Sequence, residues 1–566
     1  MLGGNSIFMT KQAYDSPLSR FLLLPVWLGI KPKLSSRQFT FITALFFVLF
    51  SNQAFWKASL NTFQSLSFGN IAFIFSMFIV LLALLNVFLS LICFRYIFKP
   101  LVIGMLISTS LTSYFMDSYG VMLDGTMVQN VMQTDYSESF ELLTPQLFYY
   151  LFLLGIFPSV CVLRIEVQYK TFARELWVKL WTVVVSLLVI SALLFCFYQS
   201  YSSLARNNRY LRHLVNPVSY IYSLGSYIGR LNKGAHSVIK PLGEDAVLTE
   251  TWKRGDKSNL VILVLGETAR QMNFSLNGYK RVTNPLTSTK NIINYKNFYS
   301  CGTATAVSLP CLFSNLDRHG YSDAKAKGQE GLLDVLSHAG IEVLWRDNNS
   351  GCKEACDRVT YEKLSHLKVV DLCSSSECYD EILLYKLQAY LENLKGDAVI
   401  VLHQKGSHGP AYHLRYPPSF EKFKPVCATS QLQECEQQEI INAYDNTILY
   451  TDYFLAKTID FLKANSARFN TAMIYISDHG ESLGENNLYL HGLPYFIAPD
   501  EQKHVPFMVW FSDGFVANNS IDSSCLHGQE EENYSHDNIF HSMLGLMGVT
   551  TAAYEKKLDL FADCRG

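Results

Sequence analysis

Long apolar runs dominate the chain up to about residue 200, and short apolar runs recur through the rest. Each long run is close to the roughly 20 residues that an α-helix needs to span a bilayer. We therefore predict membrane helices near residues 39–56, 71–94, 99–116, 146–163 and 178–198. The earlier stretch 21–30 is apolar but short and contains Pro25, so we interpret it as a segment at the membrane interface.

The second part of the chain alternates short apolar runs with amphipathic stretches. The apolar runs predict strands at 259–265, 340–345, 397–403, 472–477 and 506–511, and the stretches between them predict helices at 330–338, 379–394 and 437–464. Such alternation is typical of an α/β domain around one largely parallel sheet. We expect a five-helix transmembrane domain in 1–198, an amphipathic connector in 199–247 and the α/β domain in 248–566.

Positive charges indicate which connections face the cytoplasm, because Lys and Arg collect on that side of a membrane. They occur before the first span, between the second and third, and between the fourth and fifth: Lys11, Arg20, Lys31, Lys33, Arg37, Arg95, Lys99, Arg164, Lys170 and Arg174. The other connections carry Lys57 alone and, from Asp117 to Glu141, five acids without a base. An odd number of spans then places everything after about residue 200 outside the cytoplasm.

The charge of the chain argues against two classes of function. A net charge of −2 without a long basic run leaves no electrostatic footprint for nucleic acid. The predicted spans carry no charge near their centres, which argues against an ion pump or proton-coupled transporter. All 14 histidines follow residue 212, so we expect the chemistry in the exported half.

Cysteine spacing supports export. Of the 13 cysteines, Cys93, Cys161 and Cys196 lie in predicted spans, where they are interpreted as small apolar residues. The other ten lie in pairs that are close in the sequence, and this spacing predicts five disulfides: Cys301 with Cys311, Cys352 with Cys356, Cys373 with Cys378, Cys427 with Cys435, and, farther apart, Cys525 with Cys564. Zinc ribbons are the alternative, but they normally need two CxxC pairs at set spacing, which this chain lacks.

Two apolar runs end next to residues of the types that commonly bind metals. One ends in Gly266-Glu267-Thr268 and the other in Ser477-Asp478-His479-Gly480, and parallel sheets bind ligands at such strand ends. Between them lies CGTATA, which contains Thr305. Zinc held by Glu267, Asp478, His479 and the Thr305 oxygen would have four N and O ligands and would activate the hydroxyl as a nucleophile.

Other residues near these runs leave alternatives open. Thr305 is equally well read as the N-cap of a helix, and Thr303 and Ser308 are neighbouring hydroxyls. His408 and His491 follow predicted strand ends and could bind a second metal or a phosphate, although lone histidines are more often structural. We expect His403 to be buried. Lys353 could hold a phosphate, but an exposed loop lysine is the commoner outcome.

Six motifs follow the predicted membrane helices: GETAR, SCGTATAVSLPCLFS, WRDNNSGCK, HGPAY, SDHGESLGE and YLHGLP. With these motifs the chain resembles the lipid A phosphoethanolamine transferases of Gram-negative bacteria, a family that includes the mobile colistin-resistance enzymes. The resemblance covers nearly the whole chain. It implies an alkaline-phosphatase-like (sulfatase-like) domain that holds one tight zinc, with a second during turnover. It also implies a phosphoethanolamine site at Ser350, Lys353, His408 and His491, and lipid contacts from Asn130, Thr134 and Glu138, whose spacing predicts one helix face.

The resemblance further implies the reaction. Thr305 would take phosphoethanolamine from phosphatidylethanolamine and pass it to a phosphate of lipid A, which lowers surface charge and confers polymyxin resistance. The protein would be a monomer of the bacterial inner membrane with a periplasmic catalytic domain. Transferases acting on core sugars or glucans, and glycerol-phosphate transferases, are the alternatives, followed by a non-catalytic lipid-binding or sensor protein. A sulfatase would need a CxPSR-type sequence, and CGTATA lacks its proline and arginine.

Overall fold

The computed structural model describes residues 31–63, 67–134, 136–234, 239–249, 252, 257–374 and 377–565. The chain forms two compact units, one of Met1–Asp117 and Pro145–Tyr220, the other of Ser118–Thr144 and Ile221–Gly566. The expected boundaries at residues 198 and 247 stay a prediction, and the units differ from them in grouping Ser118–Thr144 with the second half. The expected interfacial segment 21–30 lies outside the described residues.

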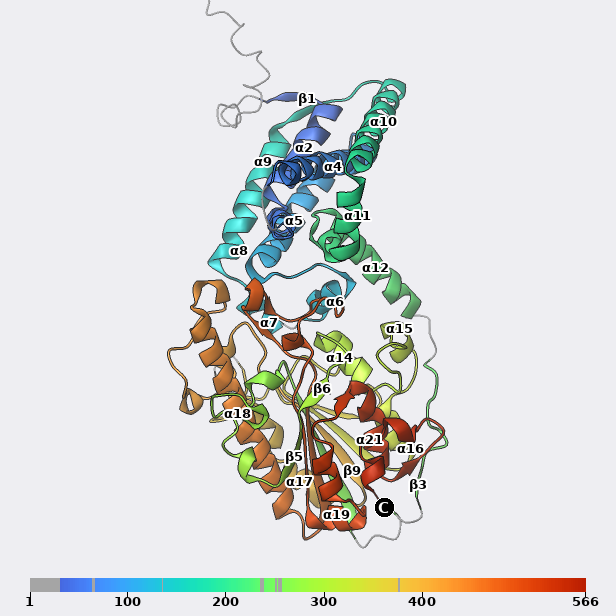
Figure 1. Cartoon of the computed structure of the whole chain (residues 1–566), viewed down its shortest axis with the longest axis vertical. Helices are drawn as coiled ribbons and strands as arrows, with labels where there is room; N and C mark the ends of the chain where they lie inside the picture. Colours follow the sequence, from blue (N-terminus) through green and yellow to red (C-terminus); the bar gives the residue numbers. More distant parts are fainter. Residues whose placement is uncertain are drawn as a thin grey trace, which may run out of the picture. The chain divides into compact units, whose positions relative to one another are not determined.

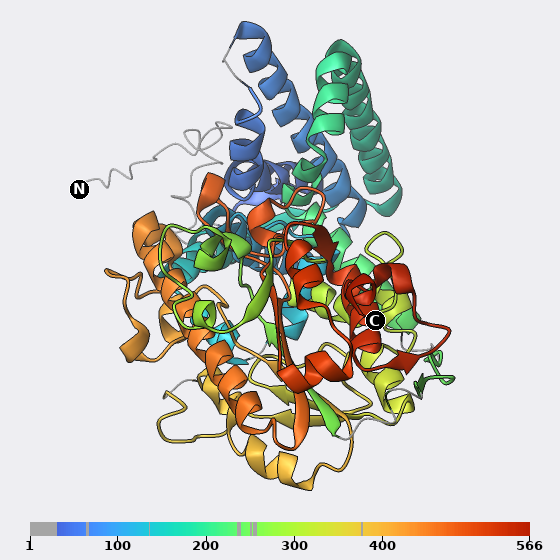
Figure 2. The same cartoon turned by 60° about the horizontal axis from the view of Figure 1, so that its bottom comes forward.

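Apolar helices make up most of the first unit. They are α2 (Ser36–Phe50), α3 (Gln53–Leu60), α4 (Phe68–Ile92), α5 (Phe98–Tyr119), α8 (Pro145–Tyr150) with the π-helical turn η2 (Leu151–Ile156), α9 (Phe157–Arg164), α10 (Phe172–Cys196) and α11 (Tyr198–Asn207). The 3-10 helix η3 (Arg209–Leu214) follows in this unit, and α12 (Val218–Gly234) begins in it but belongs mostly to the second unit. β1 (Lys33–Ser35) pairs in parallel with β2 (Glu166–Gln168), and α4 packs against α10 (Figure 2).

Helices occupy all five predicted spans, but they differ in how apolar they are. Among the described residues, three are long and apolar enough to cross a membrane: 68–92, 145–164 and 172–196. α2 and α3, bent by 55° relative to each other, would make a fourth as a broken span. α5 does not reach the same hydropathy, because Lys99 near its start and the Ser/Thr-rich stretch Ser108–Ser113 dilute its apolar residues. A total of five spans therefore stays a prediction.

A seven-stranded sheet forms the centre of the second unit. Its order is β5 (Ile292–Tyr295), β13 (Phe507–Phe511), β10 (Phe469–Ser477), β4 (Ser258–Gly266), β9 (Ala398–His403), β7 (Glu342–Asp347) and β8 (Thr360–Lys363). β13 is antiparallel to both neighbours, and all other pairs are parallel. This confirms the predicted α/β class. The five predicted strands are present, whereas the edge strands β5 and β8 were not predicted.

Helices cover both faces of the sheet. Along β4, Leu260, Ile262 and Val264 pack with α17 (Leu387–Asn393) and α18 (Gln437–Ala464). The alternate residues Val261, Leu263 and Leu265 pack with α14 (Thr305–Leu312), α16 (Leu332–His338) and α21 (Ile539–Leu546) on the other face. Successive residues of a strand face opposite sides of the sheet, and helices cover both sides. Every position is therefore apolar, and the strand appears in the sequence as a continuous apolar run. Figure 1 shows α18 on one side of the sheet and α16 with α21 on the other.

Shorter elements complete the second unit. They are α6 (Gly125–Gln133), α7 (Tyr136–Glu141), β3 (Val247–Leu248), β6 (Asn297–Tyr299), α15 (Asp323–Ala326), η7 (Asp380–Leu384), β11 (Ser482–Leu483), β12 (Tyr489–Leu490), α19 (Asp513–Asn518), α20 (Ser523–Gly528), β14 (Asn533–Ser535) and β15 (Val549–Thr550). The helix expected at 379–394 is divided into η7 and α17, because Lys386 between them has a left-handed backbone with φ 57°. The helix expected at 437–464 is α18 in full.

The ten cysteines of the second unit are joined in the five pairs that their spacing predicts: Cys301–Cys311, Cys352–Cys356, Cys373–Cys378, Cys427–Cys435 and Cys525–Cys564. Cys93, Cys161 and Cys196 are free thiols in the apolar helices. Short disulfide loops restrict the unfolded chain and persist in oxidising compartments. Their distribution fits a second unit outside the cytoplasm.

Candidate active site

Two neighbouring strands end side by side at the site. β4 and β10 pair in parallel through Gly266 and Ser477. The next residues, Glu267 and Asp478, therefore leave the sheet at the same carboxyl edge. The backbone N–H of Thr268 donates to Oδ1 of Asp478 at 3.2 Å and ties the two corners together. The structure thus unites two motifs that lie far apart in the sequence.

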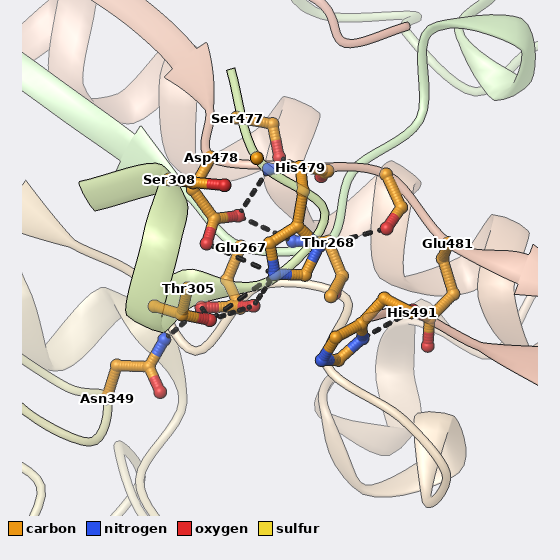
Figure 3. Close-up of polar contacts among 12 residues, drawn as sticks. Glu267, Thr268, Thr305, Ser308, Asn349, Ser477, Asp478, His479, Glu481 and His491 are labelled. Atoms are coloured by element: carbon orange, nitrogen blue, oxygen red, sulfur yellow. Dashed lines mark hydrogen bonds and ion pairs between the residues drawn. The ribbon is translucent and has the colours of Figure 1, made fainter. Parts of the chain in front are cut away.

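The side chains at these corners form one buried cluster. Ligand atoms of Glu267, Asp478 and His479 all lie within 4.8 Å of one another, and all three residues are fully buried. Oγ1 of Thr305 is 3.2 Å from each carboxylate oxygen of Glu267 and 3.3 Å from Nε2 of His479. Figure 3 shows Thr305 directed at the other three side chains. The four residues grouped by sequence reasoning therefore share one site.

The position of Thr305 corrects one expectation. Thr305 is the first residue of α14, while Ala304 occupies the N-cap position without a side-chain cap bond. The N-cap interpretation of Thr305 is therefore wrong, because its hydroxyl turns away from the helix backbone toward Glu267. The neighbouring hydroxyls have other partners. Thr303 donates to the Leu493 carbonyl at 2.6 Å, and Ser308 Oγ lies 3.4 Å from Ser300 Oγ.

Burial and charge displace the pKa values of the cluster in different directions. For Glu267, burial favours the neutral acid, but the hydrogen bond and charge of His479 outweigh it and lower the carboxyl pKa. For Asp478, burial and the nearby charge of Glu267 raise the pKa to about 6. Burial disfavours charged His479, yet the carboxylates of Asp478 and Glu267 raise its pKa to about 9. Such displacement in one small cluster is typical of functional sites.

The donor set fits a divalent cation with N and O ligands. Nδ1 of His479 lies 3.0 Å from the Gly480 carbonyl, so Nδ1–H donates there, and a bound cation would replace the proton on Nε2, which is directed into the cluster. Among the described residues, Oδ2 of Asp478 has no hydrogen-bond partner although it is buried, and it lies 3.3 Å from Nε2 of His479 as an ion pair. A buried carboxylate oxygen without a hydrogen bond is costly unless a charged partner or a ligand completes it. Together with Glu267 and the Thr305 oxygen, these atoms match the ligand types of a four-coordinate zinc site.

A supporting group behind the cluster was missed by sequence reasoning. Nδ2 of Asn349 donates to Oε2 of Glu267 at 2.7 Å and to the Gln404 carbonyl at 2.9 Å. His403 is buried as expected, and its Nδ1 lies 3.0 Å from Oδ2 of Asp347. The sequence did hold a signal for Asn349, because NNSG (348–351) follows directly on the carboxyl end of β7. These polar residues orient Glu267 from the side of the sheet.

Two further histidines lie beside the cluster. The ring centroids of His479 and His491 are 4.3 Å apart, and those of His491 and His408 are 5.3 Å apart. Nδ1 of His491 lies 2.7 Å from Oε2 of Glu481, whose other oxygen accepts from the Tyr412 hydroxyl at 2.6 Å. Burial lowers the pKa of His408 well below its usual value. Glu481 was not singled out from the sequence, although it stands in the same SDHGES motif.

The remaining expected residues lie on loops and in the segment Ser118–Thr144. Lys353 is only partly exposed, and its Nζ donates to Ser350 Oγ at 3.0 Å. α6 carries Asn130 but ends at Gln133, and Thr134 has an extended backbone with ψ 134°. The prediction that Asn130, Thr134 and Glu138 share one helix face is therefore wrong, because the helix breaks between them. The side chain of Glu138 lies outside the described residues.

Comparison with known proteins agrees with this geometry. The sulfatase family model matches residues 259–549, and the model described as phosphoethanolamine transferase EptA/EptB matches residues 81–231. Over 537 residues the chain is 40% identical to phosphoethanolamine transferase EptA of Escherichia coli K12, covering 94% of this chain and 98% of the relative. The chain belongs to the phosphoethanolamine transferase family.

Further relatives extend this result for the transferase. The chain is 39% identical over 478 residues to phosphatidylethanolamine transferase Mcr-1 of Escherichia coli, covering 82% of this chain and 88% of the relative. Its fold matches the integral membrane lipooligosaccharide phosphoethanolamine transferase A of Neisseria meningitidis with a TM-score of 0.91 and 36% identity, covering 94% of this chain and all of that one. The similarity therefore includes both the apolar helices and the α/β unit.

Proposed function

We propose that the protein transfers phosphoethanolamine from phosphatidylethanolamine to a phosphate of lipid A through a phosphoethanolamine–Thr305 intermediate. The observation that carries this proposal is the convergence of the Thr305 hydroxyl on Glu267 and His479, at 3.2 and 3.3 Å, within a buried set of metal-ligand types. A threonine hydroxyl is a weak nucleophile at neutral pH and needs such activation. The same arrangement has no use in a lipid-binding or sensor protein without catalysis.

The ligands we assign to one tight zinc ion are Glu267, Thr305, Asp478 and His479. When bound, zinc supplies a Lewis acid that lowers the pKa of the Thr305 hydroxyl and neutralises phosphate charge. Asn349 holds Glu267 in place through its 2.7 Å hydrogen bond, and Gly480 fixes the His479 ring. A second zinc ion during turnover is compatible with His408 and His491, whose rings lie next to the cluster.

Thr305 carries the phosphoethanolamine group as a phosphate ester between donor and acceptor, in two steps. In the first, Oγ1 forms a bond to the donor phosphorus while the bond from phosphorus to the glycerol oxygen breaks. The hydroxyl gives up its proton, and the departing diacylglycerol oxygen takes one up. In the second, an oxygen of a lipid A phosphate forms the new bond to phosphorus while the bond from phosphorus to Oγ1 breaks. Oγ1 then takes up the proton released by the acceptor phosphate or by water, and Thr305 regains its hydroxyl.

We assign the phosphoethanolamine group to the side chains around this centre. Ser350 and Lys353 lie 3.0 Å apart as a hydroxyl and an ammonium that suit phosphate oxygens. His408 and His491 complete the same surface beside His479. We place Asn130, Thr134 and Glu138 nearer the lipid portion of the substrates, as part of the segment Ser118–Thr144.

The relatives and the apolar helices support the proposed substrates and location. The name of the Mcr-1 relative gives phosphatidylethanolamine, and that of the Neisseria relative gives lipooligosaccharide. We propose a monomer in the inner membrane, with a multi-pass domain in 1–198, a connector in 199–247 and a periplasmic domain in 248–566. Each transferred group adds an ammonium to an anionic surface, which weakens attraction for cationic peptides such as polymyxin.

Mass spectrometry of lipid A tests this function. Cells that produce the protein should show lipid A with an added phosphoethanolamine mass, whereas cells that produce Thr305→Ala should not. Thr303→Ala is the matched control, because this nearby hydroxyl is bonded to the Leu493 carbonyl, and it should retain the modification. Phosphoethanolamine on core sugars or glucans, or glycerol phosphate in its place, would contradict the proposed acceptor or donor.

A further inference from the structure

The segment Ser118–Thr144 belongs to the same compact unit as the active site, although apolar helices flank it in the chain. Its helix α6 packs against α14, the helix that begins at Thr305. Nε2 of Gln129 lies 3.5 Å from the Ala306 carbonyl, and Nζ of Lys353 lies 3.5 Å from the Gln133 carbonyl. The segment therefore contacts Ala306, which follows Thr305, and Lys353, which we assign to the phosphoethanolamine group.

α6 also lies close to the loop that carries His491. The next residue, Gly492, has a φ of +88°, and its N–H donates to the Thr303 carbonyl at 2.7 Å. A Cβ at Gly492 would lie 2.7 Å from Cε of Met127 and 3.4 Å from Nδ2 of Asn130. A side chain at this position would therefore displace the end of the Met127 side chain. The segment is fitted closely to the site on this side.

A buried arginine holds the end of the segment on another side of the site. Nη2 and Nη1 of Arg415 donate to the two carboxylate oxygens of Glu141 at 2.6 and 3.1 Å. Nε of the same guanidinium donates to the His408 carbonyl at 2.7 Å. Nη1 also donates to Glu377 at 2.5 Å. Arg415 thus joins the last residue of α7 to the backbone of a residue that lines the active site.

The chemistry of this contact favours a fixed geometry. Two-point pairing of a guanidinium with a carboxylate is charge-assisted and specific in direction. The Arg415 side chain is fully buried, and the carboxylates of Glu377 and Glu141 overcome the effect of burial and raise its pKa. Removing one partner of a buried pair leaves the other charge uncompensated, so the contact resists opening.

We propose that Arg415 is a positioning residue that fastens the segment Ser118–Thr144 to the His408 loop and thereby sets where lipid substrates meet Thr305. This inference rests on the proposed function. Cleavage of a small soluble ester needs only the buried cluster and the phosphate-binding residues. Transfer between two lipids also needs a fixed segment beside that cluster, because each headgroup must reach Thr305 while its acyl chains stay in the bilayer.

The test compares two variants of the full-length protein that differ in which partner of Arg415 is changed. Glu141→Gln alters the partner on the segment, and Glu377→Gln alters the partner that lies outside the segment. Each variant replaces one carboxylate by an amide of the same shape. For each, kcat and KM are measured with phosphatidylethanolamine in detergent micelles and lipid A as acceptor, and with p-nitrophenyl phosphoethanolamine. Arg415→Lys is a third variant, which keeps the charge but loses the planar fork.

Glu141→Gln should raise the KM for the lipid donor about tenfold, as expected for a lost charge-assisted pair. Its constants for the soluble ester should stay within about twofold of the wild type, a difference below the usual worth of one hydrogen bond. Glu377→Gln should leave the ratio of the two activities unchanged, and Arg415→Lys should repeat the selective loss. Amide hydrogen exchange in α6 should quicken in Glu141→Gln but not in Glu377→Gln.

If Glu141→Gln lost lipid transfer and ester cleavage in the same proportion, the contact would only stabilise the fold, and the proposal would be overturned. An unchanged lipid KM in Glu141→Gln would overturn it as well. A wild-type protein that neither cleaves the ester nor modifies lipid A would contradict the proposed function instead. The two failures are therefore distinguishable in the same set of measurements.

Discussion

The buried cluster and the residues around it are built in different ways. Glu267 and Asp478 follow paired strands of the central sheet, and neither is exposed to solvent. Lys353 and His491, by contrast, lie on loops and remain partly exposed, and Lys353 has a left-handed backbone with φ 51°. Paired strands fix the two carboxylates proposed as metal ligands, whereas loops carry the groups proposed to recognise the substrate. Substitutions in the two regions should therefore fail differently.

The largest effect should come from Thr305→Ala. Loss of the nucleophile should lower transfer by about 10³-fold or more, as for other covalent catalysts. Folding should be retained, because the variant removes one hydroxyl and leaves Glu267, Asp478 and His479 in place. Transfer rate and thermal melting are the measurements. Near wild-type transfer by Thr305→Ala would contradict the covalent mechanism.

Loss of a carboxylate ligand should come next. Asp478→Asn and Glu267→Ala should each weaken zinc binding by more than about 100-fold, since residues that only orient a ligand already contribute about 10- to 100-fold. Elemental analysis of purified protein reports the zinc content. Asp445→Asn, which alters a buried carboxylate bonded to Asn273 and Tyr279, is the control and should keep its zinc. Full zinc with lost activity would reassign Asp478 or Glu267 from ligand to base.

A smaller effect is expected one layer behind the ligands. Asn349→Ala removes the 2.7 Å hydrogen bond to Glu267 and should reduce zinc affinity by about 10- to 100-fold. The neighbouring Asn348→Ala is a matched control, because Asn348 donates to Asp380 and the Cys378 carbonyl and not to Glu267. Zinc titration of both variants compares them. Equal loss in the two would mean that Asn349 acts through folding alone.

The smallest effect should appear on the recognition side. Lys353→Met should raise the KM for a phosphoethanolamine ester by about tenfold, because it removes one ammonium from a charge-assisted contact. Zinc content should stay unchanged. Lys327→Met is the control, since Lys327 pairs with exposed Glu354 at 2.7 Å. Loss of zinc in Lys353→Met would contradict the proposed division between a buried cluster that binds zinc and loop residues that bind the substrate.

The sequence predicts the cluster better than its surroundings, and the reason is structural. Long apolar runs mark β4 and β10, so the acids at their ends could be recognised from spacing alone. The edge strands β5 and β8 have only four residues each. β8 is polar and mostly exposed, and β5 is buried but interrupted by Asn294, so both leave little hydrophobic signal. Local patterns also cannot show which atoms meet across a fold. The bond from Asn349 to Glu267 joins residues 82 positions apart.

Helix ends were the other source of error. The spacing of Asn130 and Thr134 suits one helix, but Thr134 has an extended backbone at the end of α6, and its hydroxyl donates to the Asn130 carbonyl at 2.7 Å. Threonine side chains that bond the preceding turn compete with regular helix. The role of Glu141 was also missed, because its partner Arg415 lies 274 positions away. Such contacts emerge only from the folded chain.

The most direct test of the central claim is mass spectrometry of the intact protein after brief incubation with phosphatidylethanolamine in the absence of lipid A. The account predicts a fraction of the protein that carries one phosphoethanolamine group, located on Thr305 by peptide fragmentation and released when lipid A is added. Thr305→Ala should carry none. A group attached to Thr303 or Ser308, or transfer at full rate without any covalent adduct, would contradict the account.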